Sequence, residues 1–140
     1  MAANTFQCTL ITPEAKVLDE AVTAAVVPLW DGQMGFLPSR APIVGQLGVG
    51  ELRVDTAGGS KSFLIDDGFA QMLENRLTIL AAKATPADKV NEAEIQAELA
   101  EANARKTEGL VGPDLEKVRN DRQKAAARLR TARSMKTGSR

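Results

Sequence analysis

The composition of this 140-residue chain allows one domain of ordinary size, or a smaller domain with an appendage, and it excludes several kinds of site. There is no histidine and only one cysteine, Cys8, so histidine-based catalytic triads, the usual zinc sites and an internal disulfide are excluded. Tyrosine is absent and aromatic residues make up 4% of the chain, which argues against nucleic-acid binding through base stacking. The formal net charge is zero.

The N-terminal sequence and the hydropathy pattern show no signal for export or membrane insertion. The segment MAANTFQ lacks the basic patch and apolar run of a signal peptide, and no apolar stretch approaches the ~20 residues that a transmembrane helix needs. We therefore expect a chain that stays in the cytosol. We also expect a bacterial source in preference to an organellar one, because no transit peptide precedes the first predicted strand.

The first 85 residues are predicted to form an antiparallel β-sandwich of about eight to ten short strands. Cys8 alternates with apolar Phe6 and Leu10 along the first of them, which predicts a buried strand position for the thiol rather than a nucleophile. The turn signals Gly58-Gly59 and Asp66-Asp67-Gly68 separate later apolar runs. The predicted strands cover residues 6–11, 16–18, 22–29, 43–47, 51–55, 61–65, 69–73 and 77–82.

The most unusual stretch of the strand region is PLWDGQMGFLPSRAP, residues 28–42. It holds the only tryptophan, Trp30, and three of the six prolines. Asp31-Gly32 and the segment 38–42 predict two chain reversals around a short extended piece over residues 34–37. Such a segment is either an ordinary hairpin connection or a preformed recognition loop, and composition by itself favours the first.

At Thr85-Pro86 the apolar period changes from that of a strand to that of a helix. Thr85 is predicted as the N-cap and Pro86 as the first residue of a helix that ends near residue 106. Residues 107–114 predict a connection, and a second helix follows over residues 115–135. Residues 86–140 are therefore expected to be a second domain, an antiparallel helical hairpin. Its predicted apolar stripe is thin, with Val90, Ala93, Ala97, Ala100 and Ala104 on the first helix and Leu115, Val118, Ala125, Leu129 and Ala132 on the second.

Charge is distributed unevenly between the predicted elements. Residues 1–85 carry six basic and nine acidic side chains, residues 86–114 three and seven, and residues 115–140 nine and two. The first helix is thus acidic and the second basic, so the two complement each other when antiparallel. Surface ion pairs contribute only ~0–1 kcal/mol each, and a thin stripe buries little area. Two arrangements stay open at this point: a hairpin that detaches, and two helices folded on the sandwich.

The sequence contains no signature of catalysis or of a cofactor site. A phosphate-binding loop, a dinucleotide fingerprint and a cluster of metal ligands are all missing, so we expect no cofactor and no metal. Asp66-Asp67 is the only adjacent acidic pair of the strand region, and its place before Gly68 favours a turn over acid-base chemistry. The basic residues of the second helix suit either solvent, an acidic protein face or nucleic acid.

Six segments in this order resemble one family over essentially the whole chain. They are FQCTLITPEAKVL, DGQMGFLPSRAPIV, LGVGELRV, FLIDDGFAQM, LTILAAKA and the acidic-then-basic hairpin with Leu129-Arg130 near its end. The family is the epsilon subunit of the F-type ATP synthase, equivalent to the mitochondrial delta subunit. Its loop pattern, Gly-x-Leu/Met-Gly followed by an apolar pair, Pro, two variable residues, Ala and Pro, is matched closely from Gly32 to Pro42.

The resemblance implies a non-catalytic subunit of the central stalk of a rotary, proton-translocating ATP synthase. In that reading the sandwich touches the gamma subunit through one face and the membrane c-ring through the end that carries the loop. The chain would lie peripherally at the cytoplasmic side of the plasma membrane. By matching position, the residues near the c-ring would be Gln33, Met34, Gly35, Phe36 and Arg40. Residues 27–30 and Phe36-Leu37 would anchor the loop in the core, and two positions stay open for Trp30, packed inward or on the contact face.

The resemblance also implies a regulatory role for the hairpin, which in this family extends and inhibits ATP hydrolysis. The candidates for contacting an acidic segment of a catalytic beta subunit are Arg122, Arg128, Arg130 and Arg133. Some members bind ATP through an apolar residue, Asp, two residues, Arg and Ala at the start of the first helix. Here Asn91 replaces the acid and Glu94 the arginine, so we expect no nucleotide binding.

One alternative belongs to a different class of function. The chain would then be a β-sandwich adaptor whose basic helix binds an acidic protein or nucleic acid. Recovery of gamma subunit and c-ring in a pull-down would favour the stalk subunit, and recovery of RNA with steep salt dependence would favour the adaptor.

Overall fold

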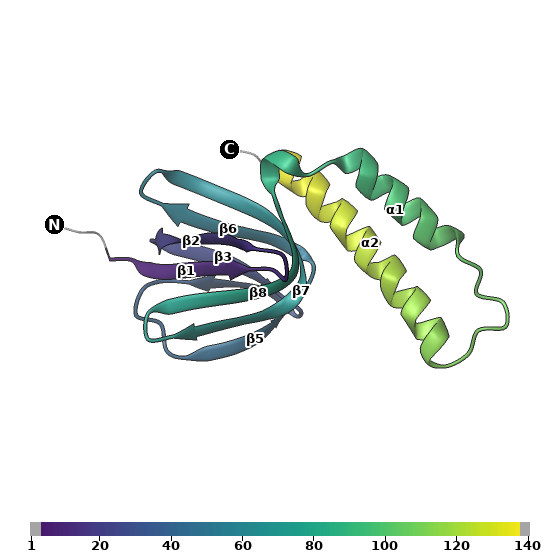
Figure 1. Cartoon of the computed structure of the whole chain (residues 1–140), viewed down its shortest axis with the longest axis horizontal. Helices are drawn as coiled ribbons and strands as arrows, with labels where there is room; N and C mark the ends of the chain where they lie inside the picture. The colour runs from purple at the N-terminus through teal and green to yellow at the C-terminus, as the bar shows by residue number, and fades with distance from the viewer. Residues whose placement is uncertain (1–3, 138–140) are drawn as a thin grey trace. The chain divides into compact units, whose positions relative to one another are not determined.

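The computed structural model describes residues 4–137, with side chains up to Met135. The chain consists of two compact units (Figure 1). The first unit is Met1–Lys89 and the second is Val90–Arg140. The division thus falls at Lys89, a few residues beyond the boundary at residue 85 that the sequence predicts.

The first unit is a β-sandwich, as predicted, built from eight strands. Their order in the sheet is β2-β1-β8-β7-β5-β3-β4, and β6 pairs with both β3 and β7. Among the described residues the strand pairs are antiparallel except β1 with β8, which is parallel. The strands are β1 (Phe6–Ile11), β2 (Lys16–Val22), β3 (Ala24–Leu29), β4 (Gly32–Phe36), β5 (Ile43–Leu47), β6 (Gly50–Thr56), β7 (Gly59–Leu73) and β8 (Arg76–Pro86).

The predicted turn at Asp66-Asp67-Gly68 is wrong, because these residues lie inside the long strand β7. The first part of β7 pairs with β6 and its second part with β5, while β8 pairs with residues 63–73 of β7, on both sides of this change of partner. At the change of partner the φ angles of Asp67 and Gly68 are +52° and +133°. The glycine is required there, since a Cβ on Gly68 would lie 1.9 Å from the carbonyl oxygen of Leu80. The turn signal therefore marks a bend within one strand.

Alternating apolar side chains from all eight strands form one core. Cys8 is among its fully buried members, as the sequence predicts. Burial, with a smaller contribution from the charges of Glu20 and Asp19, raises the pKa of the Cys8 thiol to about 12. Because the thiol is held in its neutral form, Cys8 acts as a small apolar side chain. Other large members of this core include Phe6, Leu10, Leu47, Leu52, Ile65, Met72, Leu77 and Ile79.

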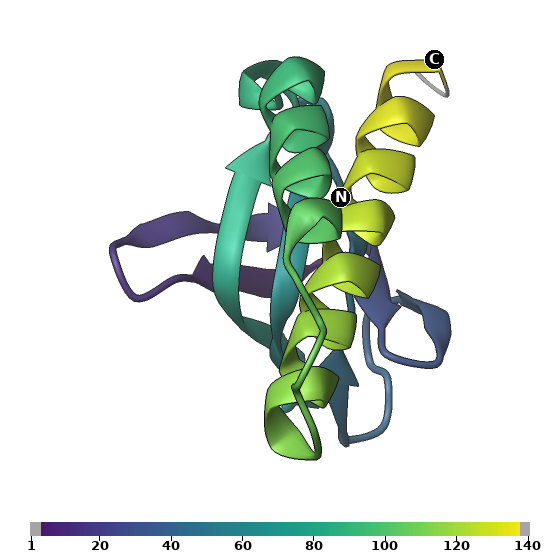
Figure 2. The ribbon, with the colours of Figure 1, turned by 90° about the vertical axis from the view of Figure 1, so that its right-hand side faces the viewer.

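The second unit is a helical hairpin, but its first helix begins later than predicted. Thr85 and Pro86 extend β8 by pairing with Leu64 and Phe63 of β7. A 3-10 turn, η1 (Ala87–Lys89), follows, and the helices are α1 (Glu92–Ala104) and α2 (Pro113–Thr137). Thr85 and Pro86, which were predicted as the N-cap and the first residue of the helix, are therefore part of the sheet. Figure 2 shows the two helices side by side, with the chain running in opposite directions along them.

The buried face of α2 agrees with the predicted stripe, whereas that of α1 does not. Val118, Ala125, Leu129 and Ala132 of α2 are buried. On α1 the alanines predicted to pack, Ala93, Ala97, Ala100 and Ala104, are exposed. Ile95 and Ala102 are buried instead and Leu99 is partly buried, a set that keeps helical spacing. The larger Ile95 and Leu99 remove more apolar area from water than alanine does, so they occupy the inner face.

Candidate functional site

The loop predicted to bind a partner begins with the short edge strand β4. This strand pairs with β3 alone, and Gln33 lies opposite Pro28 and Phe36 opposite Ala25. Because side chains alternate along a strand, Gln33 and Gly35 lie on one side of β4, and Met34 and Phe36 on the other. The first pair is exposed, Met34 is half-buried, and Phe36 is 3% exposed.

Arg40 joins the inner side of this strand. Its guanidinium carbon lies 5.4 Å from the centroid of the Phe36 ring, and Nη2 lies 3.7 Å from Met34 Sδ. A cation at this distance over a ring is attracted by the negative face of the ring. Of the five predicted residues, the structure thus brings Met34, Phe36 and Arg40 into contact, while Gln33 and Gly35 lie on the opposite side. Phe36 supports the loop from the core.

Trp30 and Leu37 flank β4, and both point to solvent. Trp30 is 70% exposed, although its backbone N–H donates to Gln46 O at 2.9 Å. Leu37 is 64% exposed, so the expectation that it anchors the loop in the core is wrong. The indole side chain contributes apolar surface at the tip of the β3–β4 hairpin, and the backbone beneath it is held by the sheet.

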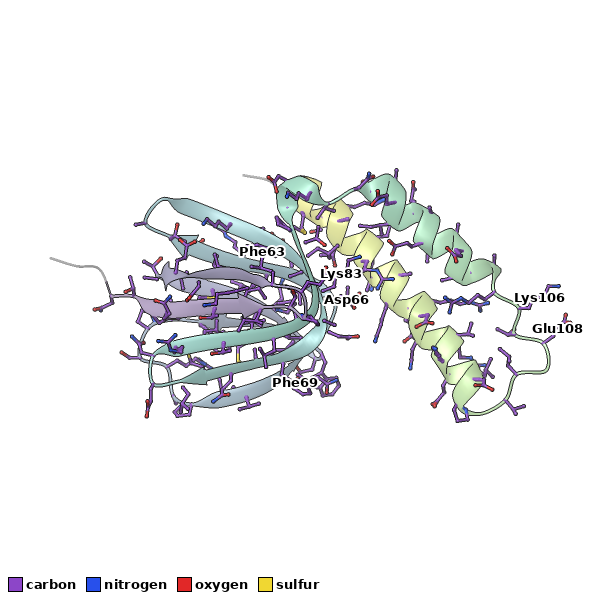
Figure 3. All side chains as sticks on the ribbon, in the orientation of Figure 1. Phe63, Asp66, Phe69, Lys83, Lys106 and Glu108 are labelled. Atoms are coloured by element: carbon purple, nitrogen blue, oxygen red, sulfur yellow. The ribbon has the colours of Figure 1, made fainter. Side chains whose placement is uncertain are left out.

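A second surface, which the sequence reasoning missed, is an apolar outer face on the sandwich. We call it the apolar face, and it consists of Val44 on β5, Phe69 and Leu73 on β7, and Leu80 on β8. These side chains are between 44% and 70% exposed, and Figure 3 labels Phe69. Phe69 lies directly opposite Leu80 in the register of β7 and β8. The sequence does indicate this face. In the segments FAQML and LTILAA apolar residues occur at both odd and even positions, a pattern typical of strands that are covered on both faces.

The arginines of α2 mostly contact α1 and do not form a separate basic surface. The guanidinium of Arg122 donates to three carbonyl oxygens at the end of α1, those of Ala102 at 3.1 Å, Asn103 at 3.4 Å and Arg105 at 2.7 Å. It thereby satisfies carbonyls near the C-terminus of α1, where Ala102 O also accepts from the cap N–H of Arg105 at 3.4 Å. Arg128 lies 3.6 Å from a carboxylate oxygen of Glu98.

The contacts of the hairpin continue toward the far end of α2. Arg133 Nε donates to Glu92 Oε2 at 3.3 Å. Between Arg128 and Arg133, Arg130 is exposed, and its side chain makes no hydrogen bond or ion pair with any of the described residues. Lys106 and Glu108, labelled in Figure 3, lie in the connection between the helices. Arg133 is exposed as well, so of the four predicted residues Arg130 alone combines exposure with the absence of a side-chain hydrogen bond or ion pair to the described residues.

The two residues that depart from the nucleotide pattern have a structural use at the start of α1. Asn91 is the N-cap, and its side-chain oxygen accepts from the backbone N–H of Glu94 at 3.2 Å. Glu94 lies in the first helical turn, where a negative charge is favoured by the helix dipole.

Residues 4–137 contain no candidate metal site and no helix that could cross a membrane. Their Cys, Asp and Glu side chains form no group of three or more that could hold a metal ion. In the same part of the chain, neither helix combines the length and the apolar character that crossing a membrane requires.

Comparison with known proteins identifies relatives of the whole chain. The family model described as the beta-sandwich domain of the ATP synthase delta/epsilon chain matches residues 5–87. An ATP synthase epsilon chain of Desulfitobacterium hafniense is 31% identical over 134 residues, which cover 94% of this chain and 99% of the relative. One of Symbiobacterium thermophilum is 36% identical over 125 residues, with 89% and 90% covered.

Solved structures share the fold. A chain of the mitochondrial ATP synthase of Euglena gracilis, solved as an OSCP/F1/c-ring assembly, matches with a TM-score of 0.72 at 22% identity, and the match covers all of this chain and 84% of that one. A chain of the Tetrahymena thermophila central stalk and c-ring matches with a TM-score of 0.61 at 14% identity, with 91% and 93% covered. Together with the sequence matches, these findings show that the chain belongs to the epsilon-chain family of the F-type ATP synthase, whose members are non-catalytic subunits of the central stalk.

Proposed function

We propose that this chain couples the gamma subunit to the c-ring during proton-driven ATP synthesis, and that its helical hairpin inhibits ATP hydrolysis. The observation that carries the coupling role is the construction of β4. Its outer side chains are available to a partner, while Phe36 and Arg40 brace its inner side. A connector that transmits torque needs stiffness rather than reactive groups, and a preformed loop has little conformational entropy to lose on binding.

The contact with the c-ring involves Gln33, Met34, Gly35 and Arg40, with Phe36 as the internal support. Through this contact the subunit lies peripherally at the cytoplasmic side of the plasma membrane. Contact with nucleic acid has no part in this function.

A crosslink tests the c-ring contact. The variant Gln33→Cys is assembled into the complex and oxidised with a c-ring whose polar loop carries a cysteine. Cys8 gives no background, because it is fully buried and its thiol has a pKa of about 12. The matched control is Ala57→Cys, an exposed turn residue beyond the opposite end of β3. A crosslink from position 33 and none from position 57 is expected, and equal yields would refute the contact.

The apolar face supports the second half of the coupling role. Apolar side chains that gather on a surface mark a contact with another protein, and we assign this one to the gamma subunit. Phe69→Ser is expected to weaken copurification of gamma at least tenfold. Val111→Ser is the control, since Val111 is 77% exposed but lies in the hairpin connection. If both variants retain gamma equally, the assignment is wrong.

The inhibitory role rests on the charges of α2. In the folded hairpin Arg122, Arg128 and Arg133 contact α1, so their engagement with an acidic segment of the beta subunit requires α2 to leave α1. Arg130 is already exposed, so it makes the first approach, aided by long-range attraction.

Truncation after Lys89 tests inhibition without disturbing β8. The truncated complex is expected to assemble and remain coupled while its ATP hydrolysis rises. Arg130→Glu should give a smaller rise in the same direction, and Arg119→Glu, the same change at another exposed position of α2, should give none. Unchanged hydrolysis after truncation would exclude an inhibitory hairpin.

Nucleotide binding is not expected, because Asn91 caps the helix and Glu94 places a negative charge where a phosphate would need a cation. Isothermal titration of the isolated chain with ATP checks this, and a sub-millimolar affinity would contradict it.

A further inference from the structure

The turn between β7 and β8 lies against the loop that follows β4. Leu73 pairs with Arg76, which leaves Glu74 and Asn75 as the two turn residues, with φ angles of +49° and +61°. Positive φ at both central positions defines a type I′ turn, where asparagine is among the favoured residues. The turn geometry favours asparagine or glycine at position 75, but it does not require a side chain.

Both polar atoms of the Asn75 side-chain amide nevertheless form hydrogen bonds. Its Oδ1 accepts from the backbone N–H of Ser39 at 2.8 Å, and its Nδ2 donates to the carbonyl oxygen of Thr5 at 2.8 Å. The backbone carbonyl of Asn75 also accepts from the N–H of Gln7 at 3.2 Å. One residue therefore joins three segments that are far apart in the sequence: the start of β1, the loop after β4, and the β7–β8 turn.

These contacts demand one residue type. A backbone N–H can only donate and a carbonyl oxygen can only accept, so the amide has a single orientation that satisfies both. Aspartate lacks the donor for Thr5, and glycine lacks both groups. Among non-glycine residues, asparagine is one of the few that readily adopt a positive φ.

Ser39 is the neighbour of Arg40 in the proposed c-ring contact, and its own φ is +65°. A non-glycine residue in this conformation is strained unless its surroundings hold it there. The hydrogen bond that the Ser39 N–H donates to Asn75 Oδ1 fixes the Ser39 amide, and Arg40 then lies over Phe36 and beside Met34. The loop is thus fastened at two adjacent residues, by a hydrogen bond at Ser39 and by the ring contact at Arg40.

We infer that Asn75 is a positioning residue, which holds Ser39 and Arg40 in the conformation that meets the partner and so contributes to coupling. The inference rests on the proposed function, because it concerns the same contact surface. Asn75 itself need not touch the partner, and its effect passes through the Ser39 amide.

Three variants of the full chain separate this role from that of the turn. Asn75→Gly removes both side-chain hydrogen bonds and keeps a residue that accepts positive φ. Asn75→Asp retains the acceptor for Ser39 but loses the donor to Thr5. Glu74→Gly is the matched control, since it changes the other turn residue, for whose side chain the structure shows no hydrogen bond within the described residues.

Amide hydrogen exchange at Ser39 is the direct readout. Asn75→Gly is expected to speed exchange about tenfold, the size of one net hydrogen bond, whereas Asn75→Asp and Glu74→Gly should leave it near the wild-type rate. Unchanged exchange in Asn75→Gly would overturn the inference.

The functional readout is the number of protons pumped per ATP hydrolysed by the assembled complex. This ratio should be lower in Asn75→Gly than in the wild type and near the wild-type value in Asn75→Asp. The thermal unfolding midpoint of Asn75→Gly should be close to that of Glu74→Gly. If exchange at Ser39 rises while the coupling ratio stays constant, the positioning role is wrong although the hydrogen bond is real. Failure of the Gln33→Cys crosslink with Asn75 intact would instead refute the proposed function.

Discussion

The sandwich and the hairpin bury their apolar side chains in different ways. The sandwich draws large aliphatic and aromatic side chains from eight strands into one core, and many of them are fully buried. The hairpin buries Ile95, Val118 and Leu129 together with alanines. Burial of about 25 cal/mol per Å² of apolar area then gives the sandwich far more stabilisation than the hairpin.

Both units carry ion pairs, and in the hairpin these supplement a small apolar core. In the hairpin, charged side chains join the two helices, with Arg105 to Asp121 at 2.6 Å and Arg133 to Glu92 at 3.3 Å in addition to Arg122. Exposed pairs of this kind are weak and are screened by salt. One chain therefore combines a unit stabilised by a large apolar core with a unit whose helices separate at a small cost in free energy. Four predictions test this difference.

The largest expected effect is in the sandwich, at Gly68. Gly68→Ala should destabilise the first unit by about 4 kcal/mol or more, because its φ is +133° and the new Cβ would lie 1.9 Å from Leu80 O. The control is Gly59→Ala, which has a similar φ of +127° but no atom within 4 Å of the new Cβ. Urea unfolding, followed by NMR signals of each unit, measures both. Equal losses would show that the close approach at Gly68 is relieved by movement of β8.

Truncation of one buried leucine in each unit compares the two directly. Leu52→Ala in β6 should cost about 3 kcal/mol, the middle of the range for core leucines, and it should lower the unfolding midpoint of the sandwich. Leu129→Ala in α2 should reduce the helical circular dichroism at 222 nm while the NMR signals of the sandwich persist. If Leu129→Ala unfolds both units together, they are not independent in stability.

The third effect is at the end of α1. Arg122→Ala removes hydrogen bonds to three carbonyl oxygens and is expected to destabilise the hairpin by about 1–2 kcal/mol. Arg130→Ala removes the same charge without losing a contact to a described residue, so it should change the thermal melting of the helices by less than about 0.5 kcal/mol. Similar losses in both variants would assign the effect to net charge.

The smallest expected effect is the pH dependence that Cys8 gives to the stability of the sandwich. The pKa of the thiol is raised from 9.0 to about 12 in the folded state. Below pH 9 the thiol is protonated in both states, so stability is complete; above pH 9 the unfolded state loses its proton first and stability falls. The loss should be about 1 kcal/mol between pH 8 and pH 10.

Urea unfolding at the two pH values measures this loss, and the variant Cys8→Ala removes the contribution of the thiol. The change with pH in the wild type should exceed that in the variant. An identical change in both would mean that the thiol titrates at its ordinary pKa. That result would require the core to open around Cys8, so the sandwich would be less rigid than its packing indicates.

Much of the fold follows from local sequence. The alternation of Phe6, Cys8 and Leu10 predicts β1, and the helical spacing of Val118, Ala125, Leu129 and Ala132 predicts the buried face of α2. These predictions are confirmed because each depends on neighbours within one element. The loop residues Gln33 and Gly35 were also selected from the sequence, through the resemblance to the family, and their role stays a prediction.

The predictions that were wrong concern residues whose structure depends on segments distant in the chain. Thr85 and Pro86 have the chemistry of a helix start, but pairing with Leu64 and Phe63 draws them into β8. Asp67-Gly68 has the chemistry of a turn, but β8 pairs on both sides of it and leaves only a bend. In both places the hydrogen bonds of a sheet outweigh a local preference worth less than a few kcal/mol.

By itself the sequence determined the two classes of structure, their order along the chain, and the acidic and basic character of the two helices. The tertiary structure alone decided that Asn75 reaches Ser39 and Thr5, that Arg40 lies over Phe36, and that Val44, Phe69, Leu73 and Leu80 share one outer face. The physical reason is that periodicity reports which side of an element is apolar, whereas contacts between loops arise only when sheet register brings distant residues together.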